Sequence, residues 1–179
     1  GPAGPDTPRA DPVEAQDVLD TLEILEEVGV SATVEGGWGI DALLGYQYRD
    51  HSDLDLIIET KWVDVALDAM ASVGFVVIVD HRPISVRLAD PHGRAIDMSF
   101  VVFDGTNAAW RGSKNPERVE PDYPSHGFTY GWIAGRKVAC LSPETQVRRH
   151  LGYRYTDRDV SDLKELKERF SVALPEGLY

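Results

Sequence analysis

The sequence predicts an α/β fold of the α+β type, in which helices flank a mixed β-sheet and further helices follow at the C-terminal end. Three observations predict it. Apolar residues recur at helical spacing over residues 13–28 and again over residues 160–170. Apolar runs over residues 54–59 and 95–103 have the length and composition of buried strands. The turn signal Asp-Pro-His-Gly at residues 90–93 predicts a hairpin between two strands.

The composition is that of one globular domain. With 179 residues, 42% of them hydrophobic, the chain can bury a core, and we predict a tail over residues 1–11 and a single domain over residues 12–179. Its one cysteine, Cys140, cannot form an internal disulfide, and no apolar run of 18 residues or signal peptide is visible. We therefore expect a cytoplasmic protein with no membrane segment.

The formal net charge of −12 bears on the partners of this protein. Proteins that bind nucleic acid usually present basic patches, so the charge disfavours nucleic acid as a partner. It is compatible with a cationic small molecule drawn to an acidic cleft, and equally with a charge that only aids solubility. The sequence is also compatible with a homodimer.

Caps and periodicity predict the elements of the first half. A helix starts at Pro12, with Asp11 as its cap, and stops at Gly29. Two further helices are expected over residues 38–44 and 62–73, each followed by a glycine. Strands are expected at residues 31–35, 53–59, 75–80, 84–89 and 95–103, the last four of them side by side in the mixed sheet.

In the second half, residues 104–123 show little periodicity and are rich in Gly, Asn, Pro and charge, which predicts a long loop of the kind that often carries function. Short strands are expected over residues 128–133 and 137–141. Ser142 caps a helix that runs to about Leu151, and a last helix begins at Asp157 or Asp159.

Two carboxylates open the strand at residues 53–59. Asp53 and Asp55 are two positions apart, so strand alternation puts both side chains on one face, with Cα atoms roughly 6.5 Å apart at about 3.3 Å per residue. Carboxylates this close repel each other unless a cation lies between them, and Mg²⁺ takes oxygen ligands. The pair therefore predicts a divalent-metal site. The alternative is a polar strand start that faces solvent.

Asp97 is a single acid in the apolar run of residues 95–103. An unpaired buried carboxylate is costly, and the cost falls if Asp97 joins Asp53 and Asp55 around a metal. The predicted sheet brings it close to that pair. A surface acid, or one satisfied by hydrogen bonds, is the alternative.

Gly36 and Gly37 lie between a predicted strand and a predicted helix. They place free backbone N–H groups at a helix N-terminus, where a phosphate binds, although a plain tight turn is the alternative. Trp38, which follows them, either lines a nucleotide pocket or lies in the core.

The loop before the two acids carries Arg49 and His51. A guanidinium at this place can pair with triphosphate oxygens through two hydrogen bonds. His51 either contacts phosphate, orients an acid or makes a structural hydrogen bond to the loop.

Together these features resemble the polymerase-β-type nucleotidyltransferase pattern. The wording GGWGIDALLG, followed by R-x-H-x-DLD, is similar to that of the small antibiotic nucleotidyltransferases, and most similar to the lincosamide class beside the aminoglycoside class. The similarity extends to residues 95–103 and 135–166. It implies a nucleotidyltransferase fold. It also makes Lys164, in the recurring Asp-Leu-Lys wording, a candidate triphosphate contact, with an exposed surface lysine as the alternative.

The resemblance implies an enzyme that transfers AMP from ATP to a hydroxyl group of a small antibiotic, with a lincosamide as the nearest case. Asp53 and Asp55 would bind two Mg²⁺ ions, and Asp97 would bind the second ion, accept the hydroxyl proton, or do both. The glycine pair, Trp38, Arg49, His51 and Lys164 would hold the nucleotide.

Three alternatives stay open at this point. In the first, the acceptor is an aminoglycoside or another small metabolite. The acids Glu117, Glu120 and Asp122 would favour an aminoglycoside by attracting its ammonium groups. The chain is instead a non-catalytic binding module of the same fold, which an intact set of three acids argues against. The third alternative is a metal-dependent phosphohydrolase, which the Gly-Gly element disfavours.

Overall fold

The computed structural model describes residues 10–114, 117–150 and 155–178. Its helical elements are α1 (Ala15–Glu27), α2 (Gly36–Leu44), the 3₁₀ turn η1 (Thr60–Trp62), α3 (Val63–Ala71), α4 (Pro143–Arg149) and α5 (Asp157–Phe170). Its strands are β1 (Thr33–Glu35), β2 (Asp53–Glu59), β3 (Val76–His81), β4 (Ser85–Ala89), β5 (Ala95–Phe103), β6 (Ala109–Arg111), β7 (Phe128–Ile133) and β8 (Arg136–Leu141).

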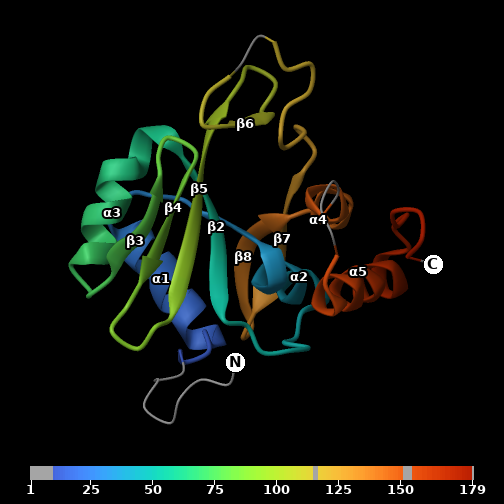
Figure 1. Ribbon diagram of the computed structural model, residues 1–179, viewed down its shortest axis with the longest axis horizontal. Helices are drawn as coiled ribbons and strands as arrows, with labels where there is room; N and C mark the ends of the chain where they lie inside the picture. Colours follow the sequence, from blue (N-terminus) through green and yellow to red (C-terminus); the bar gives the residue numbers. More distant parts are fainter. Residues whose placement is uncertain (1–9, 115–116, 151–154, 179) are drawn as a thin grey trace.

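The strands form one mixed sheet in the order β3-β4-β5-β2-β1-β8-β7, with β6 paired to β5 off this path (Figure 1). The neighbours β2 and β5 run parallel, as do β1 and β8, and the other neighbours run antiparallel. The helices α2, α4 and α5 lie together near the β7 and β8 side of the sheet. The predicted mixed sheet with flanking and C-terminal helices is confirmed.

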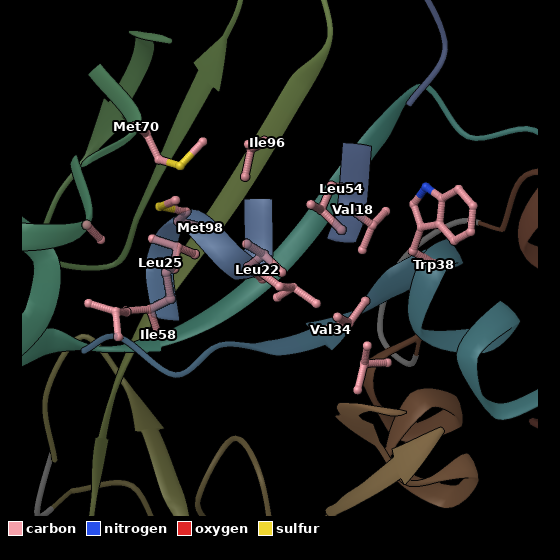
Figure 2. Close-up of a cluster of buried hydrophobic side chains, with 14 of the residues drawn as sticks. Val18, Leu22, Leu25, Val34, Trp38, Leu54, Ile58, Met70, Ile96 and Met98 are labelled. Atoms are coloured by element: carbon pink, nitrogen blue, oxygen red, sulfur yellow. The ribbon is translucent and has the colours of Figure 1, made fainter. Parts of the chain in front are cut away.

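The main core lies between one face of this sheet and the helices α1 and α3. Figure 2 shows Val18, Leu22 and Leu25 of α1 packed against Leu54 and Ile58 of β2, with side chains of β5 and α3 beside them. Alternation along β2 sends Leu54, Leu56 and Ile58 into this core and leaves the odd-numbered residues on the opposite face. The opposite face of β2 therefore carries the two acids.

The structure corrects three predictions about these elements. Asp11 does not cap the first helix: Val13 pairs with His51 as an isolated bridge, which keeps the chain extended, and Glu14 takes the cap instead. The second helix begins at Gly36, directly after β1. The segment at residues 104–123 is not wholly a loop, because it turns back at Asn107 and pairs β6 with β5. Residues 1–9 of the predicted tail, and Leu151, lie outside the described residues.

Within the ranges that the structure describes, no helix combines the length and the apolar character needed to span a bilayer.

Candidate active site

Strand register places four charged residues in one row across the sheet. Glu35 on β1 lies opposite Asp55 on β2, Asp55 lies opposite Asp97 on β5, and Asp97 lies opposite Arg87 on β4. Residues directly opposite each other point to the same face, so all four side chains leave the sheet on the face that α1 does not cover. The row combines three acids with one cation.

Asp53, Asp55 and Asp97 form what we call the acid triad. Each offers a carboxylate oxygen, and these oxygens all lie within 4.8 Å of one another. The prediction that Asp97 comes close to the other two is met by the parallel pairing of β2 with β5. Clustered carboxylate oxygens are the donors that Mg²⁺ prefers, so the acid triad fits a divalent ion.

The acid triad is electrostatically unfavourable without a cation. Burial raises the pKa of Asp55 well above its ordinary value, and the charges of Asp53, Glu35 and Asp97 raise it further. Burial also raises the pKa of Asp97, although the Arg87 guanidinium opposes this shift. The folded protein thus holds these carboxylates close together at a cost that a bound cation would remove.

This cost predicts a pH-dependent stability. Asp55→Asn is expected to raise the thermal stability of the metal-free protein at neutral pH. Because the pKa of Asp55 is raised on folding, the native state binds more protons than the unfolded chain above about pH 4, and stability falls as pH rises through the raised pKa. Calorimetry in EDTA should show the advantage of the variant growing as the pH rises above about 4, the ordinary pKa of an aspartate.

A matched control for this experiment is Asp68→Asn, because Asp68 is exposed on α3. Its melting temperature should follow that of the wild-type protein at every pH. An Asp55→Asn advantage that stays constant with pH would show that the carboxylate does not titrate as described.

The glycine pair makes room for the side chains around it. Gly36 has a φ of +64°, and a Cβ atom there would lie 2.1 Å from Asp55 Oδ2. A Cβ atom at Gly37 would lie 2.4 Å from His51 Nδ1 and 2.8 Å from an Arg49 nitrogen. Both positions therefore need glycine because Asp55, His51 and Arg49 occupy the space that a side chain would take. A contact of the two glycines with phosphate stays a prediction.

Arg49 and His51 are engaged in contacts within the protein. Arg49 Nε and Nη2 donate to the two carboxylate oxygens of Asp162, each at 2.8 Å, which ties the loop to α5. His51 is 3% exposed, and its Nε2 hydrogen-bonds to Asp41 Oδ2 at 2.6 Å. Its ring lies 4.8 Å from that of Trp38. Both residues still line the pocket described next.

The remaining two nucleotide candidates lie away from this pocket lining. Trp38 is 2% exposed and packs in the main core, as Figure 2 shows. Lys164 is exposed on α5, two residues after the pocket-lining Asp162, and a step of two residues along a helix turns its side chain to nearly the opposite side. The structure therefore brings the glycine pair, Arg49, His51 and the acids Asp53 and Asp55 to one pocket. Trp38 and Lys164 do not line it, and Asp97 adjoins it through the acid triad without being part of its lining.

The pocket has a volume of about 310 Å³. Its lining combines acids at the end of β1 and the start of β2 with charged and polar side chains of α4 and α5 and with His150. The lining residues are Glu35, Gly36, Gly37, Arg49, His51, Asp53, Asp55, Leu141, Gln146, Arg149, His150, Arg158, Asp159 and Asp162.

Sequence reasoning missed Arg149 and Arg158 in this lining. Arg149 lies over the Tyr123 ring at 4.8 Å, and its Nε is buried without a hydrogen-bond partner among the described residues. The helix patterns gave no signal for these arginines, because contact with the pocket depends on how α4 and α5 pack on α2.

Sequence reasoning also missed Glu35 and Arg87, which lie at the two ends of the charged row. The Tyr123 hydroxyl donates to Glu35 Oε2 at 2.9 Å, which joins the segment after β6 to the end of β1. The position of Glu35 directly before the glycine pair was an available signal. The turn at residues 90–93 was an available signal for Arg87, because a hairpin in which Ala89 pairs with Ala95 places Arg87 opposite Asp97.

Two acids of the segment after β6, Asp122 and Glu120, are paired with arginines. Asp122 Oδ2 accepts hydrogen bonds from the backbone N–H of Arg111 and from Arg118 Nη1, at 2.7 and 2.8 Å. Glu120 pairs with Arg148 at 3.2 Å. Asp122 and Glu120 are thus offset by neighbouring guanidinium groups, and they add little uncompensated negative charge to the surface near the pocket.

The sequence of this chain is similar to that of proteins that modify antibiotics. A family model described as aminoglycoside-2''-adenylyltransferase matches residues 17–166. A lincosamide resistance protein of Staphylococcus haemolyticus is 26% identical over 155 residues, covering 87% of this chain and 95% of the relative.

Solved structures of the same group share the fold. The lincosamide antibiotic adenylyltransferase LnuA, crystallised with lincomycin, has a TM-score of 0.78 at 25% identity, covering 88% of this chain and 98% of LnuA. ANT(2'')-Ia in complex with adenylyl-2''-tobramycin has a TM-score of 0.67 at 18% identity, covering 87% of this chain and 88% of that protein. The predicted nucleotidyltransferase fold is confirmed.

Proposed function

Since this chain belongs to the aminoglycoside-2''-adenylyltransferase family, we propose that it transfers AMP from ATP to a hydroxyl group of a lincosamide antibiotic. Membership of the family, with the relatives described above, makes the chain an antibiotic-modifying nucleotidyltransferase. The observation that carries the proposed chemistry is the acid triad, whose oxygens lie within 4.8 Å of one another beside the N-terminus of α2.

Asp53 and Asp55 would hold two Mg²⁺ ions, with Asp97 as a further ligand of the ion on the acceptor side. When bound, such ions lower the pKa of an acceptor hydroxyl and neutralise charge on the phosphates. Asp97 would accept the hydroxyl proton as the acceptor oxygen attacks the α-phosphorus in line. One P–O bond forms to the acceptor, the bond to the bridging oxygen of the β-phosphate breaks, and pyrophosphate leaves.

The chain would hold the triphosphate from two sides. The first turn of α2 presents backbone N–H groups after Gly36, at the positive end of the helix dipole. Arg149 and Arg158 line the same pocket and supply positive charge to it. Arg49 supports this lining through its ion pair with Asp162, which holds α5 against the loop before β2. Guanidinium groups in a pocket that also carries the metal-binding acids suit a metal-bound triphosphate.

Two observations favour a lincosamide over an aminoglycoside. LnuA, crystallised with lincomycin, superposes more closely on this chain than ANT(2'')-Ia does, with TM-scores of 0.78 and 0.67. An aminoglycoside carries several ammonium groups, and it would need uncompensated acids to meet them. Asp122 and Glu120 are instead paired with Arg118 and Arg148. An acceptor of low charge fits this surface better.

The test is an acceptor screen with purified protein, ATP and Mg²⁺, read by mass spectrometry. Lincomycin and clindamycin are expected to gain the mass of one AMP residue, and pyrophosphate should appear in equal amount. Kanamycin and tobramycin should stay unmodified. An Asp53→Asn variant serves as the control for contaminating activity. Modification of the aminoglycosides alone would overturn the assignment of the acceptor.

A further inference from the structure

Arg87 holds an unusual place among the residues of the acid triad. It lies directly opposite Asp97 in the β4–β5 register, and its Nη1 donates a short hydrogen bond to Asp97 Oδ2. The same nitrogen lies 3.4 Å from Asp53 Oδ2. One guanidinium nitrogen thus bridges two of the three acids, where a cation shared by these carboxylates would bind.

The way in which Arg87 is attached differs from that of a permanent ion pair. Both of its contacts use Nη1, and its side chain is 35% exposed. Arg49 uses two nitrogens against both oxygens of Asp162, whose side chain is 4% exposed. An ion pair that is made through one nitrogen and is open to solvent loses less free energy on separation than a buried bidentate pair does. Separation of Arg87 from the acids is therefore expected to cost less free energy than separation of Arg49 from Asp162.

We infer that Arg87 is a positioning residue which occupies, in the ion-free protein, the place of the acceptor-side divalent ion, and that this ion binds only when the guanidinium has moved away. This inference rests on the proposed function, because it takes the acid triad as the metal site. Before ions bind, the positive charge of Arg87 keeps Asp53 and Asp97 close together despite their repulsion. When the second ion arrives, the guanidinium and the ion compete for the same oxygens.

Titration of the metal-free protein with Mn²⁺, followed by the electron paramagnetic resonance signal of the free ion, tests this competition. The wild-type protein should bind one ion more tightly than the second. Arg87→Met removes the competing charge and should tighten the second site by about tenfold or more. Arg87→Gln keeps polarity without charge and should act in the same direction. Arg82→Met is the matched control, since Arg82 lies in the same hairpin and pairs with the exposed Asp80.

Thermal melting separates this role from a merely structural one. Without ions, Arg87→Met should melt below the wild-type protein because the acids then repel each other, and saturating Mn²⁺ should close the gap. A structural role would instead lower both melting temperatures alike and weaken ion binding. Unchanged second-site affinity in both Arg87 variants would overturn this inference while leaving the proposed function in place. A protein that binds no Mn²⁺ in any variant would overturn both.

Discussion

Replacing Asp97 with Asn is expected to lower the rate of AMP transfer by about 10²–10⁴-fold, the range found when a general base is removed. Asn has nearly the same shape, so the variant should keep the fold of β5 and the position of the side chain. It cannot accept the hydroxyl proton, and it offers a neutral ligand to the acceptor-side ion. The measurement is the single-turnover rate of lincosamide adenylylation at saturating ATP and Mg²⁺.

The control for this prediction separates chemistry from binding. Because the triphosphate is proposed to contact α2, Arg149 and Arg158, Asp97→Asn should leave the affinity for Mg·ATP nearly unchanged in calorimetry. Asp68→Asn, on the exposed face of α3, should leave both rate and affinity unchanged. A rate for Asp97→Asn close to that of the wild-type protein would remove Asp97 from its proposed role as base.

Local patterns predicted the acids, and long-range packing decided the rest of the site. The alternation of a strand is a property of neighbouring residues, so the shared face of Asp53 and Asp55 could be read from the sequence alone. The approach of Asp97 needed only the pairing of two strands. The partner of Arg49 could not be found in this way, because Asp162 is 113 positions away and on a helix whose packing no local pattern defines.

The same contrast explains the nucleotide candidates. Arg49 and His51, predicted from the R-x-H-x-DLD sequence, both line the pocket, and each side chain also has a partner inside the protein. Their contact with a nucleotide stays a prediction. Lys164 belongs to the Asp-Leu-Lys motif that recurs in the family it resembles, but its side chain is on the exposed side of α5. Arg158 of the same helix lines the pocket instead. The single-domain boundary, the cytoplasmic location, the homodimer and the lack of nucleic-acid binding stay predictions.

Gly36→Ala is expected to reduce adenylylation by about a hundredfold or more, the loss that a misplacement of about 1 Å causes in a catalytic group. The new Cβ atom would lie 2.1 Å from Asp55 Oδ2, so the Asp55 carboxylate must turn away from Asp53 and Asp97. The positive φ of +64° adds backbone strain at the start of α2. Mn²⁺ affinity and the transfer rate should therefore fall together.

Gly45→Ala distinguishes displacement of Asp55 from strain alone. Gly45 ends the same helix with a φ of +83°, and a Cβ atom there meets nothing within 4 Å. The substitution should therefore cost about 1–2 kcal/mol of stability through the left-handed conformation and leave Mn²⁺ affinity and rate near wild-type values. If Gly36→Ala behaved as Gly45→Ala does, the glycine would serve only the turn. A loss of ion binding confined to Gly36→Ala would show that this position must lack a side chain because Asp55 needs the space.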